Sequence, residues 1–417
     1  MTAAIIIFAC ALVVIASERV DRTKVALLGA ILVLITQTID QERAIEAVDW
    51  NTIGLLAGMM LIVRLTEETG VYTYLAIRAG QISRGRPFVL TVSLVVSTAL
   101  LSAFLDNLTT ILLMVPITFL LADALDIDPL PLVIIEIIAS NIGGAATLIG
   151  DPPNILIAGA TGLTFTEFVV NLAPIALVCL IVTTGLLYAI YRRRLTAAPE
   201  ARARVMELDA SNAIEDADEL RRAGPVLIAT ILVFFVHKQL HLEPATVALA
   251  GASVLLFLTR QPVEKALSGI EWSTLFFFLG LFVMVGALEE RGAIKEVADG
   301  IASLTGGDRS AELLGIAWAS AIGSGIVDNI PFTATMIPVV EQLQGGSDDD
   351  AYWWALSIGA CFGGNATIVA AAANVAAAGM AARAGHPIGF LQFMKIGVPV
   401  TLLTMIISTG YIALRYL

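Results

Sequence analysis

Residues 140–154 constrain the fold of this chain more than any other segment. They read Ser-Asn-Ile-Gly-Gly-Ala-Ala-Thr-Leu-Ile-Gly-Asp-Pro-Pro-Asn, in a chain that is 58% hydrophobic and only 14% charged. Soluble domains are about 45–50% apolar and about 25% charged, so the composition predicts a polytopic membrane protein. Glycine and proline interrupt helices and free backbone groups that hydrocarbon cannot satisfy. The segment is therefore predicted to be a helix break that is buried in protein or lines a wet cavity, as in transporters.

Charge and cysteine content exclude several other classes of protein. The net charge of −12 lies in the loops and argues against a nucleic-acid partner. Cys10, Cys179 and Cys361 are dispersed in apolar segments, so no disulfide framework, metal site or cofactor is expected. No nucleotide-binding loop is found, so ATP is not expected to act within this chain, although a soluble ATPase partner stays open.

The chain repeats itself, which divides it into two halves. Three short motifs recur 222 residues later: 48–52 at 270–274, 67–70 at 289–292, and 105–108 at 327–330. The glycine pair of the break recurs 220 residues later. Between the halves lies one long hydrophilic segment with seven arginines. We therefore predict a first repeat over 1–191, a cytoplasmic linker over 192–224 and a second repeat over 225–417.

Each half is predicted to be all-helical, with five spans and one re-entrant hairpin. The expected segments of the first half are 3–16, 25–39, 50–65, the hairpin 88–121, the broken helix 132–160 and 168–191; those of the second are 225–236, 245–258, 275–288, the hairpin 311–343, the broken helix 352–382 and 390–414. Because five is odd, the repeats should be inverted in the bilayer. With the linker in the cytoplasm, 16 Lys and Arg residues fall inside and six outside, which places both termini outside.

Carboxylates at membrane depth are the strongest functional signal. Asp106 and Asp328 stand at the two hairpin tips, and Asp151 stands in the first break. Burying a charge costs roughly 2.5–3.5 kcal/mol on insertion scales, so the three acids are predicted to couple transport to protons or an ion. The alternative is that Asp106 and Asp328 only cap the helices that follow them.

Amides, hydroxyls and glycines around the tips and breaks are the candidate substrate ligands. They are Asn107, Thr110, Asn141, Gly143, Gly144, Thr147 and Asn154 in the first half, and Asn329, Gly363, Gly364, Asn365, Thr367 and Asn374 in the second. The second break has Ala371 where the first has Asp151, so the site is expected to be asymmetric. The alternative for the Asn and Thr side chains is interhelix hydrogen bonding, and for the glycines close helix approach.

These motifs resemble the ArsB/NhaD permease family of the ion transporter superfamily, which includes arsenite permeases, NhaD-type sodium/proton antiporters and the melanosomal P protein. The resemblance rests on residues 48–50, 102–110, 141–147 and 149–154. It implies hairpins that meet at a central site, a transport domain that moves beside a scaffold by an elevator-like or rocking motion, and, in many members, a homodimer. The Gly-Asp-Pro-Pro-Asn form of 150–154 is closer to arsenite permeases and the P protein, whereas Asp106-Asn107 reverses the order found in some arsenite permeases.

The function expected from these features is secondary transport across a bacterial or archaeal inner membrane, not catalysis. The first hypothesis is arsenite or antimonite efflux coupled to protons, since Asn and Thr supply hydrogen bonds for a neutral trihydroxide. The second is sodium/proton antiport, in which the acids and backbone carbonyls bind the ion. An intramembrane aspartyl protease is a remote third, because its Tyr-Asp and Gly-X-Gly-Asp motifs are not found.

Overall fold

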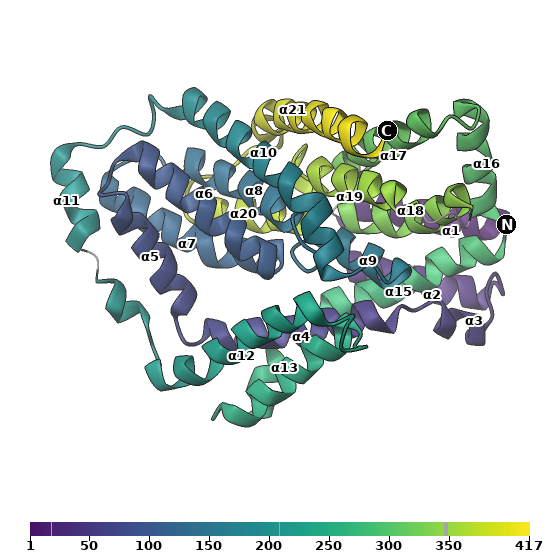
Figure 1. Ribbon diagram of the computed structural model, residues 1–417, viewed down its shortest axis with the longest axis horizontal. Helices are drawn as coiled ribbons and strands as arrows, with labels where there is room; N and C mark the ends of the chain where they lie inside the picture. Colours follow the sequence, from purple (N-terminus) through teal and green to yellow (C-terminus); the bar gives the residue numbers. More distant parts are fainter. Residues whose placement is uncertain (18, 208, 346–348) are drawn as a thin grey trace.

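The computed structural model describes residues 1–17, 19–207, 209–345 and 349–417, and these contain helices but no strand. The helices gather into one elongated body (Figure 1). In the first half they are α1 (Thr2–Ala16), α2 (Arg22–Ile35), α3 (Gln41–Glu46), α4 (Trp50–Glu67), α5 (Val71–Ile82), α6 (Pro87–Phe104), α7 (Asn107–Leu125), α8 (Leu130–Gly144), α9 (Pro152–Thr161) and α10 (Phe165–Tyr191).

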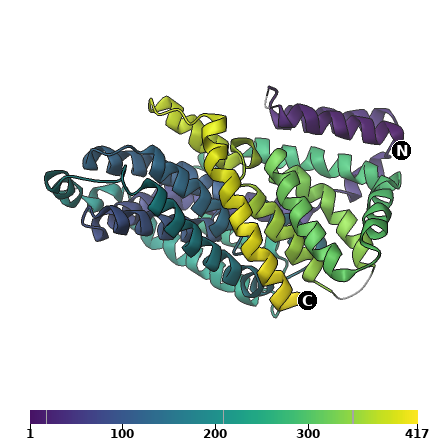
Figure 2. The same ribbon diagram turned by 90° about the horizontal axis from the view of Figure 1, so that it is seen from above.

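The second half repeats this order of helices. After α11 (Pro199–Glu207) and the 3-10 turn η1 (Ala210–Ala213) come α12 (Ala217–Val236), α13 (Pro244–Leu258), α14 (Val263–Ser268), α15 (Trp272–Glu290), α16 (Ala293–Thr305), α17 (Arg309–Ile326), α18 (Asn329–Gln344), α19 (Ala351–Gly363), η2 (Ile368–Ala370), α20 (Ala372–Arg383) and α21 (Phe390–Tyr416). In Figure 2 the last helix, α21, crosses the molecule diagonally.

Each segment expected to be helical lies in a helix, and the boundaries differ at the linker. Helix α12 begins at Ala217, inside the segment expected to be linker, because the side chain of Asp216 accepts a hydrogen bond from Glu219 N and caps the helix. Pro225, expected to start the span, therefore lies within α12. The linker also contains the short helix α11.

Two amphipathic helices were not predicted. Helices α5 and α16 follow α4 and α15, and each begins after a glycine with positive φ, Gly70 at 77° and Gly292 at 74°. Glycine adopts this left-handed conformation without steric cost, so the chain can turn sharply between consecutive helices. In Figure 1, α5 lies toward one end of the molecule and α16 lies at the other.

The two halves exchange packing partners. Helix α4 of the first half packs on α13 of the second, and α15 of the second half packs on α2 of the first. Gly58 lies against the backbone of Ala248 in one pair, and Gly280 lies against the backbone of Ala26 in the other. Small residues permit such close approach of helices. Helix α9 likewise packs on α18 while α20 packs on α7, so exchanging the halves reproduces the same set of pairs.

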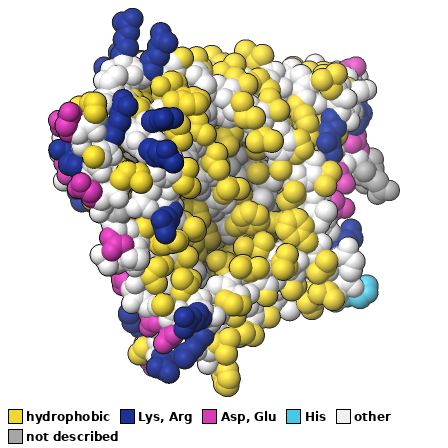
Figure 3. Space-filling view, turned by 60° about the vertical axis from the view of Figure 1, so that its left-hand side comes forward, with side chains coloured by type: hydrophobic (Ala, Val, Ile, Leu, Met, Phe, Trp, Pro, Cys, Tyr) yellow, Lys and Arg dark blue, Asp and Glu magenta, His cyan; other side chains and the backbone are white. Residues whose placement is uncertain are grey.

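Several helices are suited to a bilayer. Among the described residues α6, α7, α10, α15 and α21 are long and apolar enough to cross a membrane, and α1, α8 and α13 are shorter apolar helices. Hydrophobic side chains cover the middle of the face in Figure 3, with Lys and Arg gathered along its left edge. An apolar belt with charged residues at its edge is typical of an integral membrane protein.

Candidate functional site

The first helix break is held open by one asparagine side chain. Helix α8 ends at Gly144 and α9 begins at Pro152, where proline is tolerated because the first helical position needs no N–H partner. The Nδ2 of Asn154 donates to the carbonyls of Ala145 at 3.1 Å and Thr147 at 2.8 Å. Asn154 thereby satisfies backbone groups that the break removes from the helix.

The second break repeats this geometry. The Nδ2 of Asn374 donates to the carbonyls of Gly364 at 2.7 Å and Thr367 at 2.9 Å. Asn154 and Asn374 are both fully buried. The paired breaks therefore form a repeated structural motif in which each asparagine first serves its own backbone.

The hairpin-tip acids both cap helices. Asp106 accepts a hydrogen bond from Thr109 N at 2.8 Å at the start of α7, and Asp328 accepts one from Ile330 N at 2.9 Å at the start of α18. Asp328 also forms an ion pair with Arg22, with the Nη1 to Oδ2 distance at 2.8 Å. Capping thus accounts for part of what each acid does, and only Asp328 gains a cationic partner among the described ion pairs.

Asp151 is the point at which the two hairpins converge. Its Oδ1 accepts a hydrogen bond from Asn107 Nδ2 at 3.0 Å and another from Asn329 Nδ2 at 3.2 Å. Asn107 and Asn329 are the first residues of α7 and α18. The carboxylate is fully buried, and its Oδ2 has no hydrogen-bond partner among the described residues. Asp106 and Asp328 both lie close enough to act electrostatically on it.

Amides link Asp151 to the second break. Asn107 Nδ2 also approaches Asn141 Oδ1, at 3.4 Å, and Asn141 Nδ2 donates to Asn365 Oδ1 at 3.1 Å and to Asn374 Oδ1 at 3.0 Å. The Nδ2 of Asn365 and the Oγ1 of Thr110 are buried and unpaired within the described part of the chain. The network therefore offers unsatisfied donors as well as an unsatisfied acceptor.

The predicted threonines and glycines have structural contacts. Thr147 Oγ1 donates to the Ala103 carbonyl, and Thr367 Oγ1 donates to that of Gly325 at 2.9 Å, so each ties a break to its hairpin. A Cβ at Gly143 would lie 2.5 Å from Ala99 Cα, and one at Gly363 would lie 2.5 Å from the Ala321 carbonyl oxygen.

The second glycine of each pair faces the break. A Cβ at Gly144 would lie 2.5 Å from the Gly150 carbonyl oxygen, whereas one at Gly364 would lie 3.7 Å from Asn329 Nδ2. Of the four glycines, Gly364 is thus the one placed next to the converging asparagines. The other three sit where only a glycine leaves room for neighbouring backbone.

Sequence reasoning missed three contributors to the site. Arg22 was counted among the cytoplasmic basic residues, but it reaches the tip of the second hairpin. Ser357 Oγ donates to Asn154 Oδ1 at 2.6 Å, and the Cys361 thiol lies beside Asp151. No signal in the first half marked Ser357 or Cys361, since both contacts are made between halves.

A second pair of serines carried a signal that went unused. Ser102 and Ser324 are separated by the 222-residue offset. Their hydroxyls donate to the carbonyls of Ser140 and Ala360, each at 2.7 Å. These equivalent contacts fasten each hairpin to the helix that precedes its break.

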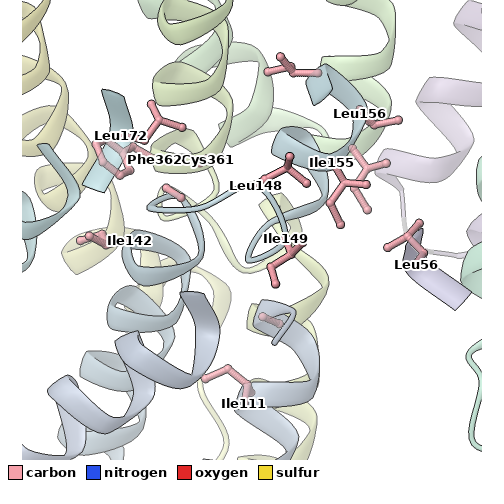
Figure 4. Close-up of a cluster of buried hydrophobic side chains, with 14 of the residues drawn as sticks. Leu56, Ile111, Ile142, Leu148, Ile149, Ile155, Leu156, Leu172, Cys361 and Phe362 are labelled. Carbon is pink, nitrogen blue, oxygen red and sulfur yellow. The ribbon is translucent and has the colours of Figure 1, made fainter. Parts of the chain in front are cut away.

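Apolar packing surrounds the first break. Figure 4 shows Leu148 and Ile149 of the break, with Ile155 and Leu156 of α9, among buried side chains near Cys361 and Phe362 of α19. These residues exclude water from the first break on that side. The polar cluster is therefore enclosed rather than spread along an open channel.

Comparisons with known proteins agree with this architecture. A family model described as a citrate transporter matches residues 12–359. An uncharacterized transporter of Mycobacterium bovis is 43% identical over 99% of this chain and 98% of its own length. The 46 kDa membrane protein of Mycobacterium leprae is 40% identical over 99% of this chain and 98% of its own.

More distant proteins share the fold over most of the chain. The P protein of Sus scrofa is 32% identical over all of this chain and 59% of its own length. The crystal structure of the Alcanivorax borkumensis YdaH transporter superposes with a TM-score of 0.59 at 15% identity, covering 88% of this chain and 85% of that one. The match of the family model over most of the chain, together with these transporter relatives, shows that the chain is an integral membrane protein of the citrate transporter family.

Proposed function

We propose that this protein is a proton-coupled secondary transporter of a small uncharged inorganic hydroxide, with arsenite or antimonite as the expected substrate. The observation that carries the proposal is the position of Asp151. One carboxylate oxygen receives both hairpin-tip asparagines, and the other is free for a proton or a solute hydroxyl. A group placed between two halves can report the occupancy of both hairpins.

The charges of the site favour a neutral or cationic solute over a polyanion. Asp106, Asp151 and Asp328 lie within electrostatic range of one another, and Arg22 is already paired with Asp328. A tricarboxylate would meet like charges here, and like-charge juxtaposition opposes binding by several kcal/mol. Citrate is therefore not the substrate that this site fits, although the family carries its name.

The free polar atoms favour a hydroxylated solute. Asn365 Nδ2 can donate, Asp151 Oδ2 can accept, and Thr110 Oγ1 can do both. A neutral trihydroxide needs donors and acceptors together, whereas a bare cation needs oxygens alone. We infer that Asp151 takes up a proton in one stage of the cycle and releases it in another, while the amides orient the solute.

Sodium/proton antiport is the second candidate. It is favoured by the carboxylate oxygen of Asp151 and by the backbone carbonyls exposed at the breaks, which are the hard oxygen ligands that alkali cations prefer. In this case sodium would replace the proton at Asp151 instead of accompanying a separate solute.

Transport by everted membrane vesicles separates these candidates. Vesicles that contain the full chain are supplied with arsenite, antimonite, sodium or citrate, with and without a proton gradient, and Asp151→Asn vesicles serve as the matched control. Gradient-dependent arsenite or antimonite accumulation that is lost in the variant supports the proposal. Sodium movement alone supports the antiporter, and citrate movement at the wild-type site would contradict both.

A further inference from the structure

A cavity of about 420 Å³ opens beside the tip of the second hairpin. Asp21 and Arg22 line it at the start of α2, Asp328 lines it at the start of α18, and Ala372 and Ala376 line it from α20. We name this cavity the access chamber. It brings together residues from both halves that are far apart in the sequence.

Small side chains of the second half account for the chamber. At the 220-residue offset Ala372, Val375 and Ala376 correspond to Pro152, Ile155 and Leu156. In the first half Ile155 and Leu156 are buried in the apolar packing of Figure 4, whereas Val375 of the second half is 39% exposed. The alanine-rich face of α20 thus leaves space where the first half is filled.

The Arg22–Asp328 ion pair lies at the inner end of this space. The Arg22 side chain is 23% exposed and that of Asp328 is 10% exposed. Arg22 also lies over the Phe277 ring of α15, with its Cζ 5.1 Å from the ring centroid. The residue after Asp328 is Asn329, which donates to Asp151. One residue therefore separates the ion pair in the chamber from a ligand of the buried acid.

The first half has no equivalent ion pair. At the 222-residue offset Pro244 corresponds to Arg22, and proline carries no charge with which to hold Asp106. Asp106 instead accepts hydrogen bonds from the backbone and hydroxyl of Thr109. The chain thus carries one cationic contact to a hairpin tip, on the side where the cavity lies.

We propose that the Arg22–Asp328 ion pair is a one-sided latch that closes the inner end of the access chamber, so that solute reaches the Asn329–Asp151 contact only when the pair separates. Separation frees the tip of the α17–α18 hairpin from α2. The inference rests on the proposed function for the identity of the solute, but the latch itself concerns access to Asp151 and can be measured without knowing the solute.

Cys361 provides the reporter, because its thiol lies beside Asp151 on the inner side of the latch. In a Cys10→Ser, Cys179→Ser background, Cys361 is the one remaining cysteine of the chain. The rate at which a small methanethiosulfonate reagent modifies it is measured by mass spectrometry on the full chain in proteoliposomes. Arg22→Gln should raise this rate about three- to tenfold, in keeping with loss of a partly buried ion pair.

Two matched variants make the test decisive. Arg19→Gln removes the same charge from an exposed position in the preceding loop and should leave the rate unchanged. Ala376→Leu restores the residue of the first half, fills the chamber and should lower the rate. If Arg22→Gln matches Arg19→Gln and Ala376→Leu matches the parent, the latch does not exist. If the rates move as expected but no vesicle moves arsenite or antimonite, the latch stands and the proposed substrate falls.

Discussion

Asp151 occupies the position in the first break that Ala371 occupies in the second. The neighbouring amides are nearly symmetric, because Asn107 and Asn329 head equivalent helices and both donate to the same carboxylate oxygen. A single acid therefore serves two hairpins. The asymmetry of the acids was predictable from the sequence, but their convergence was not, because it depends on how two distant segments approach.

Asp151→Asn should abolish coupled transport while leaving the protein folded. The substitution is nearly isosteric, but it removes the titratable group and can place an amide donor against two amide donors. We expect at least a tenfold (~1.4 kcal/mol) loss of gradient-driven uptake. Vesicle uptake at matched expression is the measurement, and size-exclusion chromatography in detergent is the control. Full uptake in the variant would exclude Asp151 from coupling.

Ala371→Asp should impair transport rather than improve it. Ala371 is buried, and its Cβ lies near Gly364 beside Asn329. A second carboxylate there would compete with Asp151 for the Asn329 amide and would be desolvated without a cationic partner. Uptake measured across pH should fall at every pH tested, and wild-type uptake would show that the site tolerates two acids.

The helices show where hydropathy is informative and where it is not. Broken helices were predictable because glycine, proline and asparagine interrupt long apolar runs at 141–154 and 363–374. Helices α5 and α16 were missed because they are short, and α16 carries Lys295, Glu296 and Asp299, so no apolar window covers it. The contact of Arg22 with Asp328 was also beyond reach, since α2 and α18 are neighbours only in the folded chain.

Gly143→Ala should destabilise the packing of α6 on α8. The new Cβ would lie 2.5 Å from Ala99 Cα, and backbone cannot yield as a flexible side chain does. Overpacking of this kind costs about 1–3 kcal/mol. Gly185→Ala on α10 is the control, because nothing lies within 4 Å of its Cβ. Thermal unfolding in detergent should show a lower Tm for the first variant alone; equal Tm values would mean that α6 and α8 can separate freely.

At the scale of the whole molecule, the exchanged pairs α4–α13 and α15–α2 bind the two halves into one body. The linker helix α11 lies at one end of the long axis and the N-terminus lies at the other (Figure 1). This arrangement agrees with inverted repeats whose linker and termini face opposite sides of the bilayer, which remains a prediction.

Sidedness can be measured with single reporter cysteines. A cysteine in the linker at Ser211 should be protected from an impermeant thiol reagent added outside intact cells, while one at Thr2 should react. The positive-inside rule gives the reason, since the seven linker arginines resist translocation. Reaction at Ser211 and protection at Thr2 would reverse the orientation.

The exchanged pairing also has a consequence for biosynthesis. When α2 and α4 leave the ribosome, their partners α15 and α13 are still untranslated, because the matching segments lie a 222-residue repeat further on. At about 5–20 residues per second, the delay is roughly 10–40 s. Throughout that interval the small-residue faces at Ala26 and Gly58 must be occupied by lipid or by the insertion machinery. Assembly therefore ends with two late docking events, and a ribosome that stalls in the second half releases a protein with both faces still unpaired.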